Sequence, residues 1–175
     1  MARKQQQMIT KASLTQVTEI TNLVNSAYRG ETSKKGWTTE AHILEGTRIT
    51  ETELTETLSD ANNTILVYQE NETIIGTVLL TNKKTELYLG MLTISPELQN
   101  TGLGRKLLVA AENFAHSLSL PKITMTVITI REELIAWYQR NGYSDTGKRE
   151  AFPSAFDDVV LHHEALEFMV IEKVL

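Results

Sequence analysis

Hydrophobic positions in the first third of the chain recur with the spacing of a helix. A short apolar strand is predicted at residues 8–12, followed by a helix that ends at residues 28–30. Two shorter helices are predicted at residues 38–44 and 51–58, each preceded by threonines that can cap it. The apolar face of the long helix consists of Leu14, Val17, Ile20, Leu23, Val24 and Ala27.

From residue 64 the pattern changes to that of β-strands. Residues 64–68, 73–81 and 86–94 are rich in β-branched and other apolar side chains, and polar turns separate them. Residues 70–72 form a predicted hairpin turn, and Pro96 ends the third of these strands. The pattern therefore predicts an antiparallel meander in the middle of the chain.

In the last third of the chain, segments with the hydrophobic spacing of a helix alternate with segments typical of β-strands. We expect a helix at residues 102–118, a strand at 122–129 and a helix at 132–140 that Asn141-Gly142 closes. Strands follow at residues 143–149 and 166–174, with a loop at residues 151–164 between them. No repeat or linker interrupts this order, so we interpret residues 1–175 as a single α/β domain with a mixed sheet.

Composition and charge narrow the classes of function. A hydrophobic content of 41% with 22% charged residues is ordinary for a soluble globular protein. A net charge of −5 argues against nucleic acid as a partner, which needs clustered Lys and Arg. No apolar run is long enough to span a bilayer, the first residues do not resemble a secretory signal, and there is no cysteine. We therefore expect a cytoplasmic protein without a membrane partner.

A polar turn between an apolar strand and an amphipathic helix carries the clearest chemical signal. It consists of Gln99, Asn100, Thr101, Gly102, Leu103 and Gly104, and Arg105 follows it. The first backbone N–H groups of a helix carry partial positive charge, so such a turn can hold an anion such as a pyrophosphate. Glycines allow the anion to approach the backbone closely. The spacing differs from the G-x-G-x-x-G pattern of dinucleotide-binding turns.

Two sequence motifs, one following the other along the chain, resemble those of the GNAT (GCN5-related) N-acetyltransferase superfamily. One is the strand, turn and helix at residues 91–108, and the other is the helix at residues 134–143, which contains Trp137-Tyr138 and Asn141-Gly142. The segments 27–30 and 36–40 are similar to those of one uncharacterised bacterial subgroup. The resemblance implies a mostly antiparallel sheet of about seven strands, flanked by helices and splayed into a V between the fourth and fifth strands. Members of the superfamily are often dimers, so a homodimer is an open alternative.

The same resemblance implies a donor site. Acetyl-CoA is the expected cosubstrate, with its pantetheine arm along Leu92, Thr93 and Ile94 and its pyrophosphate on the turn from Gln99 to Arg105. Tyr138 occupies the position of the general acid, which would protonate the departing thiolate. A tightly packed aromatic side chain is the structural alternative for this tyrosine. Many members have an asparagine where this chain has Arg131, which can reach a phosphate or lie at the surface.

The general base and the acceptor site are less defined by the pattern. Glu86 is the acidic residue of the predicted fourth strand and is our candidate for the base, with Glu40, His162 and His163 as alternatives. We expect the acceptor pocket to be built by the first helices, the loop at residues 28–37 and the segment 151–164, and we expect no metal site. Aromatic and acidic residues in these segments that can form an apolar wall or attract a cationic amine are Trp37, Phe152, Phe156, Asp157, Asp158 and Glu164.

We therefore expect an N-acetyltransferase that transfers an acetyl group from acetyl-CoA to a primary amine of a small molecule or peptide by direct attack. The alternative is a non-catalytic acyl-CoA-binding module with a sensing or regulatory role. The tyrosine at position 138 favours the enzyme, because binding alone does not need a phenol.

Overall fold

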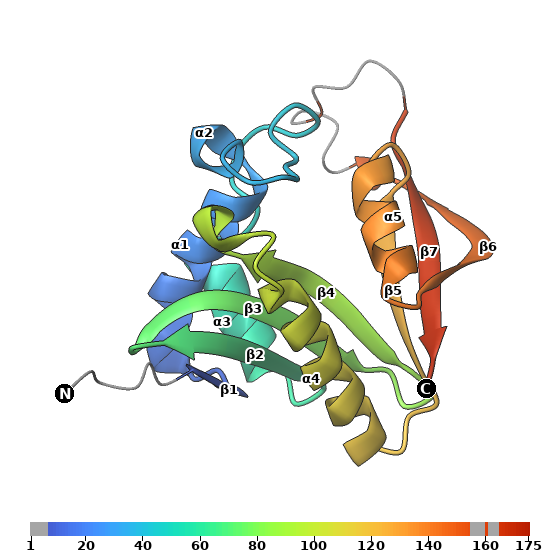
Figure 1. Ribbon diagram of the computed structural model, residues 1–175, viewed down its shortest axis with the longest axis horizontal. Coiled ribbons are helices and arrows are strands. Elements are labelled where there is room, and N and C mark those ends of the chain that lie inside the picture. The colour runs from blue at the N-terminus through green and yellow to red at the C-terminus, as the bar shows by residue number, and fades with distance from the viewer. Residues whose placement is uncertain (1–6, 155–159, 161–164) are drawn as a thin grey trace.

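A seven-stranded mixed sheet forms the centre of the protein, in the order β1-β2-β3-β4-β5-β7-β6 (Figure 1). The computed structural model describes residues 7–154, 160 and 165–175. Neighbouring strands are antiparallel except for β4 and β5, which run parallel. The strands are β1 (Gln7–Lys11), β2 (Asn63–Glu70), β3 (Thr73–Asn82), β4 (Leu87–Ile94), β5 (Lys122–Ile128), β6 (Ser144–Ala151) and β7 (Glu167–Val174).

Helices cover both faces of the sheet (Figure 1). Residues of α1 and α3 share one buried cluster with the sheet, and residues of α4 and α5 share a second, larger cluster with it. A third, small cluster joins Ile43 and Leu44 to Ile128 and Leu166. The helices are α1 (Val17–Tyr28), α2 (Gly30–Ser33), α3 (Glu51–Ser59), α4 (Leu103–Ser117) and α5 (Glu132–Arg140), with 3-10 turns at Leu14–Gln16 and Pro96–Leu98. Among the described residues, no helix is both long and apolar enough to cross a membrane.

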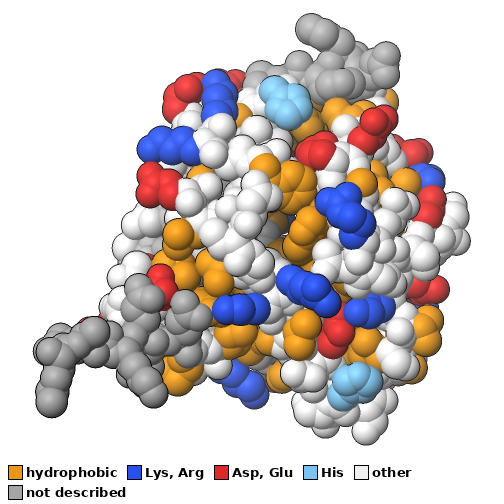
Figure 2. Space-filling view, in the orientation of Figure 1, with side chains coloured by type: hydrophobic (Ala, Val, Ile, Leu, Met, Phe, Trp, Pro, Cys, Tyr) orange, Lys and Arg blue, Asp and Glu red, His pale blue; other side chains and the backbone are white. Residues whose placement is uncertain are grey.

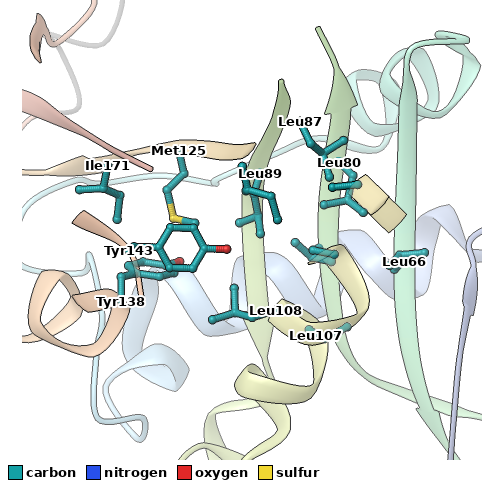
Figure 3. Close-up of a cluster of buried hydrophobic side chains, with 14 of the residues drawn as sticks. Leu66, Leu80, Leu87, Leu89, Leu107, Leu108, Met125, Tyr138, Tyr143 and Ile171 are labelled. Atoms are coloured by element: carbon teal, nitrogen blue, oxygen red, sulfur yellow. The ribbon is translucent and has the colours of Figure 1, made fainter. Parts of the chain in front are cut away.

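The alternation of side chains along β2 explains how one strand serves both layers. Ile65 and Val67 belong to the cluster under α1 and α3, whereas Leu66 and Tyr68 belong to the cluster under α4. Figure 3 shows the larger cluster, which extends from Leu66 across the sheet to Ile171. A strand buried on both faces reads as a continuous apolar run, as residues 64–68 do in the sequence.

The sheet opens between β4 and β5, as expected for the fourth and fifth strands. The two strands pair only at their beginnings, where Leu87 lies opposite Ile123 and Tyr88 opposite Thr124. Beyond these pairs the strands diverge (Figure 1). The ladder between β3 and β4 is also irregular at this point, and Met91 has a φ of 51°. Such a bulge bends its strand and redirects the backbone groups that follow it.

Most predicted elements are present with small differences in their bounds. The helix at residues 51–58 is confirmed as α3, and Thr50 and Glu53 form the reciprocal capping box at its start. The predicted helix at residues 38–44 is wrong, since this segment forms turns rather than an α-helix. Its backbone closes one turn from Glu40 to Ile43 and Leu44, after which Leu44 pairs with Val160 in an isolated bridge.

Candidate functional site

The turn that precedes α4 leaves the start of this helix open. Gly102 is its N-cap residue, with a φ of 85° that favours glycine, and no side chain caps the helix. A β-carbon at this position would meet no atom within 4 Å, so the space in front of the helix is free. Arg105, in the first turn of α4, is exposed. The backbone N–H groups of this first turn and the guanidinium together suit an anion.

The side chain of Gln99 forms hydrogen bonds within the protein. Its Oε1 accepts a hydrogen bond of 3.0 Å from the backbone N–H of Trp37, and its Nε2 donates to the carbonyl of Ile94 at 3.3 Å. The hydroxyl of Thr101 likewise donates to the carbonyl of Leu98. These bonds fix the shape of the turn, and they leave its backbone rather than its side chains available to a ligand.

A cavity that we call the turn cavity lies between the end of β4, this turn and α5. It has a volume of about 130 Å³. The predicted donor-site residues that line it are Leu92, Thr93, Ile94, Gln99, Asn100, Gly102, Leu103, Gly104 and Arg105, whereas Thr101 does not. Figure 2 shows a hollow on this face, with hydrophobic side chains inside it and Lys or Arg side chains along part of its rim.

Two tryptophans close the turn cavity on the side of α5. The ring centroids of Trp37 and Trp137 are 6.4 Å apart. A β-carbon at Gly104 would lie 3.1 Å from the ring of Trp137, so glycine allows this ring to rest on the start of α4. Trp137 therefore lines the turn cavity, and so does Trp37, for which the sequence suggests a place in the acceptor pocket.

The second cavity, the splay cavity, lies where β4 and β5 diverge. It has a volume of about 760 Å³ and is lined by residues 88–92 of β4, residues 125–128 of β5 and the segment 44–50, together with Phe152 and other side chains. No pattern in the sequence indicates that the segment 44–50 forms a wall of this cavity. The residues that line both cavities are Tyr28, Leu92, Arg131, Leu134 and Tyr138.

Tyr138 stands where the two cavities meet. It is 6% exposed and packs edge-on against Trp137 and Tyr143, with ring centroids 5.0 and 5.7 Å away. Burial, with smaller contributions from neighbouring charges, raises the pKa of its phenol, which therefore stays protonated at neutral pH. The Tyr138 hydroxyl makes no hydrogen bond with any part of the chain that the structure describes. It is thus a proton donor without a protein acceptor.

Tyr28 joins the end of α1 to the open part of β4. Its hydroxyl donates a hydrogen bond of 2.9 Å to the carbonyl of Leu92. Burial is the main cause that raises the pKa of Tyr28. The tyrosine therefore remains a donor to the strand and fixes one wall shared by the two cavities.

A buried ion cluster forms the floor of the splay cavity. Arg131 donates to Glu40 Oε1 at 3.1 Å and also to the hydroxyl of Thr38, and Glu40 Oε2 lies 3.6 Å from Nε of Arg29. The side chains of Arg131 and Glu40 are 7% and 9% exposed. Desolvation lowers the pKa of Arg29, and the charge of Glu40 opposes that shift. Arg131 is therefore a buried partner of Glu40 and not a surface residue.

Glu86 is not brought to this site. Its carboxylate accepts a hydrogen bond of 3.0 Å from Thr124 and lies 3.5 Å from Nζ of Lys122. These contacts hold it beside the closed end of the β4–β5 pair, and it lines neither cavity. Of the alternative bases, Glu40 lines the splay cavity.

Several other candidates cannot be placed in this site. His162, His163, Phe156, Asp157, Asp158 and Glu164 lie outside the described residues. Over residues 7–154, 160 and 165–175, no group of three His, Asp or Glu side chains is arranged to hold a metal ion.

Comparison with known proteins gives a family and a fold. The sequence matches the family model described as an acetyltransferase (GNAT) domain over residues 33–153. No curated protein matches the chain significantly in sequence. Many solved structures share the fold, at identities too low to carry more than the fold.

Three of these structures illustrate the likeness. An N-acetyltransferase from Staphylococcus aureus Mu50 superposes with a TM-score of 0.74 at 14% identity, covering 97% of each chain. The PaiA N-acetyltransferase from Thermoplasma acidophilum, solved in complex with coenzyme A, has a TM-score of 0.72 at 18% identity and covers 97% of this chain and 99% of its own. The ribosomal-protein-S18-alanine N-acetyltransferase from Escherichia coli has a TM-score of 0.70 at 13% identity, covering 97% and 94%.

Proposed function

This chain belongs to the GNAT acetyltransferase family, and from that premise we propose that it transfers an acetyl group from acetyl-CoA to a primary amine by direct attack in a ternary complex. The observation that carries the proposal is the position of Tyr138, a protonated phenol at the junction of two cavities. One cavity suits the donor, and the other is available to the acceptor.

The residues of the turn cavity fit acetyl-CoA. The uncapped start of α4 offers backbone N–H groups to the pyrophosphate, and Arg105 adds a positive charge. Beyond Tyr88, the described part of β5 offers no ladder partner to β4, so the edge of β4 that faces β5 can receive a pantetheine arm near residues 92–94, where the carbonyls of Leu92 and Ile94 already accept one side-chain hydrogen bond each. The tryptophan pair gives the cavity an apolar wall.

Acetyl-CoA supplies a thioester, whose acyl carbon the amine nitrogen attacks as the carbon–sulfur bond breaks. Tyr138 donates its proton to the leaving sulfur, which would otherwise depart as a thiolate. The surplus proton of the amine returns to the phenol through solvent in the splay cavity. We assign the base role to water in that cavity rather than to Glu86, because the Glu86 carboxylate is held by Thr124 and Lys122.

Thiol release from acetyl-CoA tests the proposal when it is measured across a panel of primary amines. The Tyr138→Phe variant should lower kcat by roughly 10²-fold while the KM for acetyl-CoA changes little. Tyr143→Phe is the matched control, since Tyr143 packs against Tyr138 but lines neither cavity. It should retain full activity.

Binding and turnover separate the enzyme from the alternative of a non-catalytic acyl-CoA-binding module. Acetyl-CoA should raise the melting temperature of the wild-type protein and of both variants by mass action. A melting shift without thiol release for any amine would favour the sensing module. The absence of a shift at millimolar acetyl-CoA would contradict the donor site itself.

A further inference from the structure

Arg48 presents a cation to the splay cavity. It is half-buried, lines this cavity, and its guanidinium lies 5.5 Å from the ring centroid of Tyr28. Within the described part of the chain it forms no ion pair with any carboxylate. A partly desolvated guanidinium beside an aromatic face is well suited to a bidentate carboxylate ligand.

The backbone that carries Arg48 is held in place. The side-chain oxygen of Asn25 accepts hydrogen bonds from the backbone N–H groups of Arg48 and Ile49, at 2.7 and 3.1 Å. The Asn25 amide donates in return to the carbonyl of Ile49 at 2.8 Å. The three hydrogen bonds made by Asn25 of α1 thus fix the backbone at residues 48 and 49, and with it the position of the Arg48 side chain.

Among the described charged side chains that line the splay cavity, Arg29, Arg48, Arg131 and Glu40 are buried or half-buried, whereas Glu45 and Glu53 line it from exposed positions. Glu40 lies between Arg29 and Arg131, so one carboxylate faces two guanidiniums there. The carboxylate of Glu53, although it lines the cavity, accepts its hydrogen bonds from Thr50 at the start of α3. Burial is the main cause that lowers the pKa of Arg29, and the nearby charge of Arg48 adds to it. The charge of Arg48 also lowers the pKa of Glu53, for which the hydrogen bonds from Thr50 are the larger cause.

We propose that the acceptor is a small amine that carries a carboxylate, and that Arg48 binds this carboxylate while the amine lies at Tyr138. This inference rests on the proposed acetyl transfer. Tyr28 links the two ends of the acceptor, because its ring lies under Arg48 and its hydroxyl bonds to Leu92 at the edge of the turn cavity. The length of the preferred acceptor is therefore set by the span from Arg48 past Tyr28 to Tyr138.

The same arrangement disfavours cationic acceptors. A polyamine in the splay cavity would bring a second ammonium group close to Arg48 and Arg29, where the one buried carboxylate among the described lining residues, that of Glu40, is already shared by two arginines. Like charges in a partly desolvated cavity repel strongly, so the arginines select against such amines as well as for carboxylates.

Matched pairs of acceptors test the inference. We would measure thiol release from acetyl-CoA with amino acids of increasing chain length, with their carboxamides and with spermidine, using the full chain. Each preferred amino acid should exceed its amide in kcat/KM by at least about 10-fold, which is the loss expected for one charge-assisted bidentate contact. Arg48→Gln should abolish that preference, and Arg48→Lys should retain part of it.

Arg140→Gln is the control variant, because Arg140 is exposed on α5 and lines neither cavity. It should keep the preference intact. The inference is overturned if amides or spermidine are acetylated as well as the amino acids, if Arg48→Gln leaves the preference unchanged, or if no carboxylated amine is acetylated. Acetylation of neutral amines alone would contradict this inference but leave the proposed acetyl transfer standing, whereas the absence of an acetyl-CoA melting shift would contradict both.

Discussion

Gln99 occupies the space that a side chain on Gly36 would need. A β-carbon at position 36 would lie 2.3 Å from Oε1 of Gln99, the same oxygen that accepts the hydrogen bond from Trp37. The segment after α2 and the turn before α4 are thus fitted to each other across 62 residues of sequence. The shape of the donor turn depends on this contact.

Replacement of Gly36 by alanine should displace the Gln99 side chain. Loss of its two hydrogen bonds should lower the free energy of unfolding by about 2 kcal/mol and raise the KM for acetyl-CoA. Urea denaturation and thiol-release kinetics measure the two effects. In a Gln99→Ala background the same replacement should cost much less, because the obstructing atoms are gone. If the stability losses of the two substitutions simply add in the double variant, the contact between Gly36 and Gln99 is contradicted.

Replacement of Glu40 by glutamine should destabilise the protein by roughly 3 kcal/mol, because two buried arginines lose their shared countercharge. The midpoint of urea denaturation measures this loss. Glu31→Gln removes a carboxylate that pairs with Lys34 at the surface, where its side chain is 88% exposed, and should change stability by less than about 0.5 kcal/mol. Equal effects of the two variants would show that the buried cluster is not a stabilising unit.

The control variant Tyr143→Phe should be more stable than the wild type. The Tyr143 hydroxyl is buried without a partner among the described residues, and burial raises the pKa of its phenol. Removal of this unsatisfied group should add about 1 kcal/mol, or roughly 3 °C in Tm. Differential scanning calorimetry measures the change. A clear loss of stability would indicate that the hydroxyl has a partner after all.

Asp145 should titrate well below an ordinary aspartate. Its hydrogen bonds with Arg149 and with the backbone N–H of Gly147 hold the pKa of this carboxyl at about 2. Since the unfolded value is about 3.9, its contribution to stability is present above pH 4 and is lost as the pH falls toward 2. NMR titration of the carboxyl carbon measures the pKa. Arg149→Gln should raise it, and a value near 4 in the wild type would contradict the assignment.

Local patterns in the sequence predict the elements well. The bounds of most strands follow from runs of apolar residues, although β6 is polar and exposed along its length. The helix α5 is predicted at its observed bounds, and Gly142 at its end has the positive φ of a C-terminal cap. Thr50 with Glu53 is a capping signal that can be read without the fold. These features depend on residues within one or two turns of each other.

The candidate site depends on contacts that no local pattern contains. Arg131 meets Glu40 across 91 residues, and Gln99 meets Trp37 across 62. The predicted helix at residues 38–44 fails for the same reason, since Glu40 and Leu44 take partners in distant parts of the chain. Tertiary contacts therefore determine the conformation of this segment.

The divergence of β4 from β5 also has a mechanical consequence. In the described part of the chain, only two residue pairs connect the sheet half formed by β1 to β4 with the half formed by β5 to β7. The sheet is therefore weakly connected between β4 and β5, and an extended ligand paired to β4 would add hydrogen bonds at this position. Binding of acetyl-CoA would then also stabilise the association of the two halves of the sheet. Backbone amides of both halves should therefore exchange with solvent more slowly when acetyl-CoA is bound.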